Sequence, residues 1–268
     1  MSRIANCFND LKEKNRKGLI PFIVAGDPKP EFTLPLMNAL VDGGADLIEL
    51  GVPFSDPMAD GPVIQRGSER ALVHGTSLHD VISMVADFRK ENKQTPVILM
   101  GYLNPVEVMG YEIFAKAASE AGVDGAIIVD LPPEEAGELK EFMAKYDVDL
   151  IFLISPTTNV ERQKYISKMS SGFLYYVSLK GVTGSNRLNT NSVQESVTTI
   201  KQQSNLPVGV GFGIRDPESA ANVAKVSDAI IIGSPIVELV GALNDDSATS
   251  MKSISTYLST MRQAIDAI

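Results

Sequence analysis

Short apolar runs that recur along the whole chain most constrain how it can fold. Each run is continuous rather than alternating, is rich in β-branched residues, and is bounded by glycine, proline or aspartate. Such runs are typical of strands that are buried on both faces of a parallel sheet. Eight of them are present, at residues 19–24, 47–50, 97–100, 126–129, 150–154, 173–177, 208–210 and 229–232.

Stretches with helical periodicity alternate with these runs. They cover residues 31–42, 63–74, 78–92, 111–121, 134–146, 160–169, 191–204, 217–226 and 247–267. Eight βα units at a spacing of roughly thirty residues favour an α/β fold, the (β/α)8 or TIM barrel, over a doubly wound open sheet. Since no linker or low-complexity tract interrupts the units, we expect residues 1–268 to form a single domain.

An extra N-terminal helix is expected before the first strand. Ile4, Phe8 and Leu11 recur at helical spacing within residues 2–14. We expect this helix to cover one end of the barrel. Cys7 lies within it and is the single cysteine of the chain, so an intrachain disulfide is excluded.

The charge of the chain restricts its partners. With a net charge of −9 and a pI near 4.8, the protein is not expected to bind nucleic acid or an anionic membrane. No apolar run approaches the roughly 18 residues that a membrane span requires, and no run at the N-terminus is typical of a signal peptide. We therefore expect a cytoplasmic protein.

Two carboxylates mark the second apolar run and the loop after it. Glu49 lies inside the run, and Asp60 follows in a loop rich in proline and glycine. A carboxylate within a buried strand is costly unless it is paired or used, and burial raises its pKa into a range where it can both give and take a proton. The pair predicts an acid/base site. The alternative for Glu49 is a salt-bridged structural role, for which the sequence offers no adjacent partner.

Three glycine-rich turns follow the last three predicted strands. In barrels these loops commonly bind phosphate, because glycine lets backbone N–H groups approach an oxyanion and a helix N-terminus adds a favourable dipole. The alternative is that they are ordinary tight turns. The turns are Gly181-Val-Thr-Gly184, Gly211-Phe-Gly213 and Gly233-Ser234.

Other kinds of site receive less support. His74 and His79 flank a turn between helical stretches, so neither a metal site nor a histidine-based triad is expected. Lys180 follows the sixth run, where a Schiff-base lysine could lie in an aldolase, but we expect it to be solvated. Asp130 ends the fourth run, where a turn-forming role is as plausible as a functional one.

Several long segments together resemble the tryptophan synthase alpha subunit family over essentially the whole chain. They are residues 47–62 (Leu-Ile-Glu-Leu-Gly-Val-Pro-Phe-Ser-Asp-Pro-Met-Ala-Asp-Gly-Pro), residues 100–105 (Met-Gly-Tyr-Leu-Asn-Pro), residues 125–133 and the three glycine turns. The resemblance implies a retro-aldol cleavage of indole-3-glycerol phosphate to indole and glyceraldehyde 3-phosphate. Glu49 would be the acid/base, and Asp60 would accept a hydrogen bond from the indole N–H.

The resemblance also implies which residues hold the substrate. Thr183 would belong to a mobile loop that orders Asp60 on closure. An apolar wall facing the indole would comprise Phe22, Met100, Ile127, Leu153, Tyr175 and Phe212. The phosphate would be bound by Gly184, Gly213, Gly233 and Ser234.

A partner subunit is a further implication of the resemblance. Members of the family pair with a pyridoxal-phosphate-dependent beta subunit in an α2β2 complex and pass indole to it, so no cofactor and no metal is expected in this chain. The contact would include Pro53, Phe54, Asp56, Pro57, Asn104 and Pro132. The rival interpretations are another phosphate-binding barrel enzyme, such as a sugar-phosphate epimerase or an aldolase, and a scaffold that only activates a partner.

Overall fold

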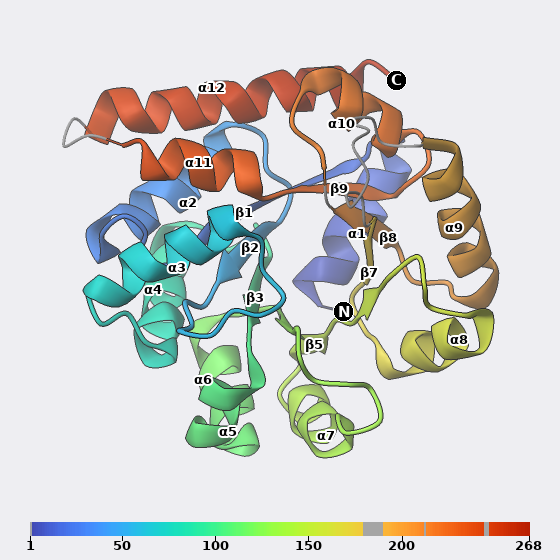
Figure 1. Ribbon diagram of the computed structural model, residues 1–268, viewed down its shortest axis with the longest axis horizontal. Coiled ribbons are helices and arrows are strands. Elements are labelled where there is room, and N and C mark those ends of the chain that lie inside the picture. Colours follow the sequence, from blue (N-terminus) through green and yellow to red (C-terminus); the bar gives the residue numbers. More distant parts are fainter. Residues whose placement is uncertain (1, 179–189, 212, 244–246) are drawn as a thin grey trace.

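Nine parallel strands, as far as the chain is described, form one sheet that curls into the ring seen in Figure 1. The computed structural model describes residues 2–178, 190–211, 213–243 and 247–268, so the predicted site residues Thr183, Gly184 and Phe212 lie outside the described part. The strands are β1 (Gly18–Val24), β2 (Ile48–Gly51), β3 (Val97–Gly101), β4 (Gly125–Ile128), β5 (Asp149–Leu150), β6 (Leu153–Ile154), β7 (Leu174–Val177), β8 (Val208–Gly211) and β9 (Ala229–Ile232).

The ring closes through the fifth predicted strand. The strand order is β5-β4-β3-β2-β1-β9-β8-β7-β6, so the two ends of the sheet are consecutive in the chain. The backbone N–H of Ile151 donates to the carbonyl of Ala126 in β4 at 2.9 Å. The carbonyl of Phe152 accepts from the N–H of Tyr175 in β7 at 3.2 Å. The predicted strand 150–154 is therefore split in two but bonded on both sides, and the predicted (β/α)8 barrel is confirmed.

Helices pack around the strands, the first of them at one end of the ring and the others on its outside (Figure 1). They are α1 (Arg3–Glu13), the 3-10 helix η1 (Pro30–Phe32), α2 (Thr33–Asp42), α3 (Pro62–Val73), α4 (Leu78–Glu91), α5 (Leu103–Met109), α6 (Tyr111–Ala121), α7 (Gly137–Lys145), α8 (Val160–Met169), α9 (Thr190–Gln203), α10 (Pro217–Ala224), α11 (Ser234–Gly241) and α12 (Ser247–Asp266). Two short helices, α5 and α11, were not predicted from the sequence. The prediction for α7 began three residues too early, because Glu135 and Ala136 form turns with Pro132 and Pro133.

Apolar side chains pack in two layers, one inside the ring and one between the strands and the outer helices. On β2, Ile48 and Leu50 belong to the outer layer together with residues of the surrounding helices. Leu47 belongs to the inner layer with Ile20 of β1 and Ile98 of β3. Successive side chains of a strand point to opposite faces. The side chain of Glu49 therefore points into the ring.

The N-terminal helix α1 covers one end of the ring, as predicted. Its Ile4, Phe8 and Leu11 belong to the inner apolar layer. The ring of Phe8 lies 5.7 Å from that of Phe173, measured between centroids. This end is the one at which the strands begin, because Phe173 directly precedes β7.

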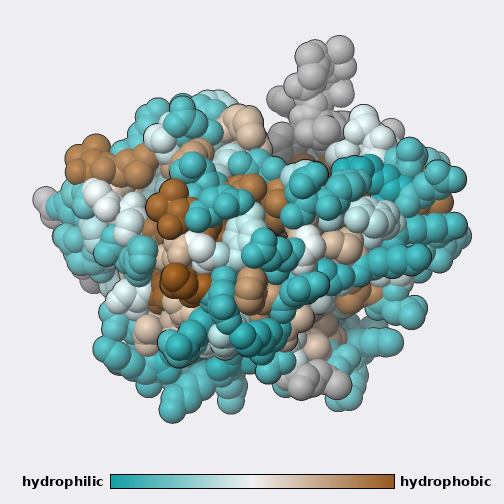
Figure 2. All heavy atoms as spheres, turned by 90° about the horizontal axis from the view of Figure 1, so that it is seen from below, coloured by the Kyte–Doolittle hydropathy of each residue, from teal (hydrophilic) through white to brown (hydrophobic). Residues whose placement is uncertain are grey.

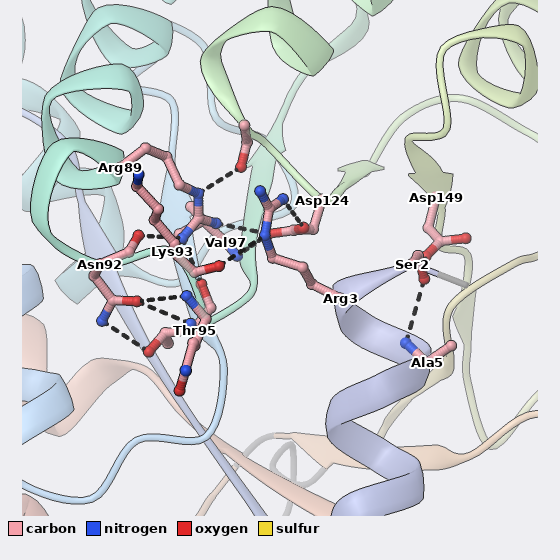
Figure 3. Close-up of polar contacts among 12 residues, drawn as sticks. Ser2, Arg3, Ala5, Arg89, Asn92, Lys93, Thr95, Val97, Asp124 and Asp149 are labelled. Atoms are coloured by element: carbon pink, nitrogen blue, oxygen red, sulfur yellow. Dashed lines mark hydrogen bonds and ion pairs between the residues drawn. The ribbon is translucent and has the colours of Figure 1, made fainter.

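A network centred on Asp124 holds α1 in place (Figure 3). The buried carboxylate accepts from Arg3 Nη1 at 2.8 Å, from Arg89 Nη2 at 2.7 Å and from the backbone N–H of Val97 at 2.8 Å. Arg89 also donates from Nε to the carbonyl of Gly122 at 2.8 Å. A buried charge that is paired and hydrogen-bonded in this way is tolerated. The network joins α1, α4, β3 and β4 at the end of the ring opposite the two catalytic candidates.

Candidate active site

Glu49 lies inside the ring with almost no access to solvent. Its side chain is 1 % exposed, and Oε1 has no hydrogen-bond partner among the described residues. Burial, reinforced by the negative charge of Asp60, raises the pKa of Glu49 to about 8. A carboxyl group with that pKa is largely protonated at neutral pH and can both donate and accept a proton. No salt bridge holds Glu49 among the described residues, so the structural alternative lacks a partner.

This buried carboxyl group makes stability depend on pH. The pKa of Glu49 is raised in the folded state from its ordinary value of 4.5 to about 8, so its contribution is fully present below pH 4.5 and is lost as the pH rises toward 8. The free energy of unfolding should fall by at most about 1.4 kcal/mol per pH unit in this window. Glu49→Gln should lack this slope. Urea unfolding at pH 5.5 and pH 8 checks it, and parallel pH dependences of the two proteins would contradict the assignment.

Asp60 approaches the same region from the loop between β2 and α3. Its Oδ2 accepts from the hydroxyl of Tyr102 at 2.9 Å. That hydroxyl in turn accepts from the backbone N–H of Ala59 at 3.0 Å, and Gln65 Nε2 donates to the carbonyl of Asp60 at 2.9 Å. Burial raises the pKa of Asp60, and the hydrogen bond from Tyr102 opposes that rise. The end of the loop that carries Asp60 is thus held by Tyr102, which directly follows β3, and by Gln65 of α3.

The predicted apolar wall lies along neighbouring strands at the height of Glu49 and just above it. In the strand register, Phe22 is opposite Glu49, Met100 is opposite Ile127, and Leu153 is opposite Tyr175. Ile127 and Tyr175 belong to the inner apolar layer, and Met100 and Leu153 pack against it. The structure therefore brings these five residues of the predicted wall to the interior of one ring.

A small cavity of about 10 Å³ shows which of these groups meet. Three of the residues predicted for the site, Phe22, Asp60 and Met100, line it together with Ile64, Tyr102 and Val129, which the sequence did not indicate as site residues. Gly51 also lines it, and a Cβ atom there would lie 2.6 Å from Cζ of Phe22. Glycine at this position therefore leaves room for the ring that faces the cavity.

Tyr175 occupies the interior through a similar arrangement. A Cβ atom on Gly211 would lie 2.7 Å from Cε1 of Tyr175, so glycine in β8 admits this ring. Burial raises the pKa of Tyr175 well above its ordinary value, and the charges of Glu49 and Asp60 add to the effect. The phenol is thus neutral and lies near enough to the two carboxyl groups for their charges to act on it. Gly211 is required for packing, a purpose that the glycine turn did not reveal.

The described glycines of the predicted phosphate site follow adjacent strands. β8 pairs with β9, so the turn containing Gly213 lies beside the one containing Gly233. Gly213 has φ of 78°, a left-handed conformation that favours glycine. Gly233 is the N-cap of α11, and Ser234 is its first residue. A helix N-terminus exposes unpaired N–H groups toward an anion.

Comparison with known proteins decides the family. The model of the family described as "Tryptophan synthase alpha chain" matches residues 8–266. The chain is 55 % identical to the tryptophan synthase alpha chain of Marinobacter nauticus, covering 100 % of this chain and 99 % of the relative. It is 54 % identical to that of Thioalkalivibrio sulfidiphilus, covering 99 % and 100 %. The chain belongs to the tryptophan synthase alpha chain family.

Solved structures agree with this assignment over the full fold. The subunit alpha of Legionella pneumophila superposes with a TM-score of 0.92 at 48 % identity, covering all of both chains. A chain of tryptophan synthase from M. tuberculosis in an aminoacrylate-bound form gives 0.88 at 31 % identity, with 99 % of this chain and 100 % of that chain covered. The protein is a carbon–carbon lyase of tryptophan biosynthesis that cleaves indole-3-glycerol phosphate.

The residues that the sequence predicts to contact a partner combine apolar and polar groups. Pro53 is buried and Pro57 half-buried, whereas Asp56, Asn104 and Pro132 are exposed. The ring of Phe54 stacks on that of Tyr102, with centroids 5.0 Å apart. Nearby on the chain, Met58 and Val108 of α5 are 77 % and 81 % exposed. Figure 2 views the molecule from the side of α5, α6 and α7, and it shows hydrophobic residues in separate patches among hydrophilic ones.

The other residues that the sequence analysis considered are two histidines and Asp130, which do not line the small cavity, and Lys180. His74 and His79 are exposed, and His74 Nε2 lies 3.0 Å from the carbonyl of Pro28. Asp130 accepts from the backbone N–H of Leu103 at 2.7 Å, which ties the end of β4 to the start of α5. Lys180 lies outside the described residues. In the described part, no cluster of three His, Cys, Asp or Glu residues is arranged to hold a metal ion, and no helix there could cross a bilayer.

Proposed function

We propose that Glu49 and Asp60 carry out the cleavage of indole-3-glycerol phosphate. The observation that carries this proposal is the buried Glu49 carboxyl group, which lacks a hydrogen-bond partner among the described residues at Oε1 and has a pKa raised to about 8. A group of this kind starts the reaction in its protonated form. The reaction needs one proton delivered to carbon and one removed from oxygen, so a single carboxyl group can serve both steps.

The first step gives a proton from Glu49 to the ring carbon that bears the glycerol phosphate chain. The ring becomes an electron sink, and positive charge develops on its nitrogen. Asp60 accepts a hydrogen bond from the ring N–H and stabilises that charge, an interaction that is stronger in the transition state than in the ground state. The half-buried position of Asp60 keeps it screened from much of the solvent.

The second step breaks the bond between the ring and its side chain. The Glu49 carboxylate takes the proton of the hydroxyl on the adjacent carbon, a carbonyl forms there, and the electron pair of the breaking bond returns to the ring. Indole and glyceraldehyde 3-phosphate result, and Glu49 is protonated again. The one proton given by Glu49 is thus returned to it, and no cofactor in this chain is needed to balance the reaction.

The substrate is held at both ends in this proposal. An apolar surface of aromatic and aliphatic side chains would contact the flat indole ring. It comprises Phe22, Met100, Ile127, Leu153 and Tyr175. Gly213, Gly233 and Ser234 hold the phosphate through backbone N–H groups and the start of α11. The proposed roles of Thr183, Gly184 and Phe212 concern residues outside the described part.

Tyr102→Phe tests how Asp60 is positioned. The change removes the hydroxyl that donates to Asp60 and accepts from Ala59, while the ring can still stack on Phe54. We expect kcat to fall about tenfold, since a hydrogen bond to a charged group contributes about 1.5 kcal/mol or more. The pKa of Asp60 should rise because the bond that lowers it is lost. The acid limb of the pH–rate profile should therefore move to higher pH, and an unmoved limb would contradict the positioning role.

The partner of this chain is proposed to be a beta subunit that holds pyridoxal phosphate and receives the indole. Pro53, Phe54, Asp56, Pro57, Asn104 and Pro132 would form the contact. The loop that includes Phe54 also carries Asp60, so binding at one end of the loop can influence the other. We expect the pair to work in the cytoplasm and the described chain to act as a single domain.

The direct test is an assay of indole release from indole-3-glycerol phosphate by the purified chain. We expect equal amounts of indole and glyceraldehyde 3-phosphate, and faster turnover when the beta subunit is added. Borohydride added during turnover should leave the chain unlabelled. A labelled lysine would instead support a Schiff-base mechanism and overturn the proposed role of Glu49.

A further inference from the structure

A groove lies at the end of the barrel opposite the candidate active site. Its lining includes residues that directly precede strands: Arg16 and Lys17 before β1, Pro207 before β8, and Asp228 before β9. The catalytic groups lie toward the other ends of the strands. The groove has a volume of about 420 Å³, which is within the range of small-molecule sites.

The charge of the groove is opposite to that of the protein. Among the described residues that line it are four cationic side chains, Lys12, Arg16, Lys17 and Lys201, against the single carboxylate of Asp228. The whole chain has a net charge of −9. A concave surface of one sign concentrates the field and attracts ligands of the other sign. The groove thus favours an anion on a protein that otherwise repels anions.

Neighbouring groups hold three of these cations in place. Lys17 Nζ donates to the carbonyl of Ser227 at 2.8 Å, and Lys201 Nζ lies 2.7 Å from Asp228 Oδ1. Arg16 Nε donates to Asp266 Oδ1 at 3.3 Å. Burial lowers the pKa of Lys17; the carboxylate of Asp228 opposes that effect, and the charge of Lys201 adds to it. An anion beside Lys17 would stabilise its charged form.

Carboxylates offset two of the four charges. Asp228 Oδ1 is paired with Lys201 while its Oδ2 accepts from the backbone N–H of Val208 at 2.8 Å, and Arg16 is paired with Asp266 and Asp46. Lys17 makes no ion pair in the described part of the chain. Lys12, at the end of α1, is exposed and makes no ion pair within the described part of the chain. Positive charge therefore remains available to a ligand.

An apolar wall accompanies the charges. Phe8 and Leu11 of α1 line one part of the groove, and Leu206 and Pro207 line another. Phosphate is readily bound by Lys and Arg side chains that converge on it. We propose that this groove binds a small organic phosphate, with the phosphate held among Lys12, Arg16, Lys17 and Lys201 and the apolar body packed against this wall.

The test uses phenyl phosphate as the probe and backbone amide NMR shifts of the full chain as the readout, at constant ionic strength. The candidate active site can also take up a phosphate, so the two sites are separated by residue. We expect saturable shifts at Asn15, Lys17, Lys201 and Leu206, independent of those at Gly213 and Gly233. Inorganic phosphate, which lacks the apolar body, should give the same shifts at higher concentration.

Two matched variants near the end of α1, Lys12 within the helix and Lys14 directly after it, show whether the effect is local. Lys12→Gln removes a charge from the lining of the groove. The dissociation constant of phenyl phosphate, measured from the groove shifts, should rise about tenfold, as expected for loss of a charged hydrogen bond. Lys14→Gln removes the same charge from an exposed residue that does not line the groove, and should raise this dissociation constant less than twofold. Equal weakening by both variants, or shifts confined to Gly213 and Gly233, would overturn the proposal.

Discussion

Glu49→Gln should lower kcat for indole release by about a thousandfold or more. General acid–base catalysis typically contributes 10²–10⁴ in rate, and Glu49 is proposed to act once as acid and once as base. Glutamine has nearly the same shape but can neither give nor take the proton. Because the side chain is buried and Oε1 lacks a partner among the described residues, a neutral amide should be accommodated without loss of the fold.

The control for this variant is Glu141→Gln, which makes the same chemical change on an exposed residue of α7. Its kcat should be unchanged. Substrate binding to Glu49→Gln, measured by titration of the inactive protein, should largely survive, since the wall and the phosphate turns are intact. Loss of folding by circular dichroism in Glu49→Gln would support a structural role instead.

The pH dependence of the wild-type reaction follows from the same group. Glu49 must be protonated when substrate binds, and its pKa is about 8. The rate should therefore fall as the pH rises through that value. This alkaline limb is the kinetic counterpart of the stability change described for Glu49.

The sequence was sufficient to predict the barrel and to single out Glu49 and Asp60 as a candidate pair, because both inferences depend on local pattern. Buried parallel strands give continuous apolar runs, and a carboxylate within such a run, as at Glu49, stands out. The extra helix α1 was predicted from the helical spacing of Ile4, Phe8 and Leu11, and the structure confirms it. The split of the fifth strand was not predictable, since it depends on how residues 150–154 divide their hydrogen bonds between β4 and β7.

Contacts between residues that are distant along the chain could not be predicted from the sequence. Tyr102 meets Asp60 across 42 positions of the chain, and only the folded ring shows that its hydroxyl reaches the loop. Val129 and Ile64 reach the cavity for the same reason. The helix α11 had a readable signal in Pro235 after Gly233 and Ser234, and in the helical spacing of the apolar residues that follow. Its eight residues are short enough to be mistaken for a loop.

Asp60→Asn should lower kcat by roughly 10²–10³, the effect typical of removing a group that stabilises developing charge. Asparagine keeps the shape and can still accept from Tyr102, so the loop should retain its conformation. The control is Asp147→Asn, which removes the same charge from an exposed residue with φ of 56°, a conformation that asparagine tolerates. That control should leave the rate unchanged.

The alkaline limb of the residual activity distinguishes an electrostatic role for Asp60 from a merely steric one. The negative charge of Asp60 is one of the two causes that raise the pKa of Glu49, burial being the larger. Removing that charge should lower the pKa of Glu49, so the activity of Asp60→Asn should begin to fall at a lower pH than that of the wild type. The shift should be partial, because burial of Glu49 is unchanged. A lower kcat with an unshifted limb would mean that the two carboxyl groups are not coupled, and the proposed pair would then be wrong.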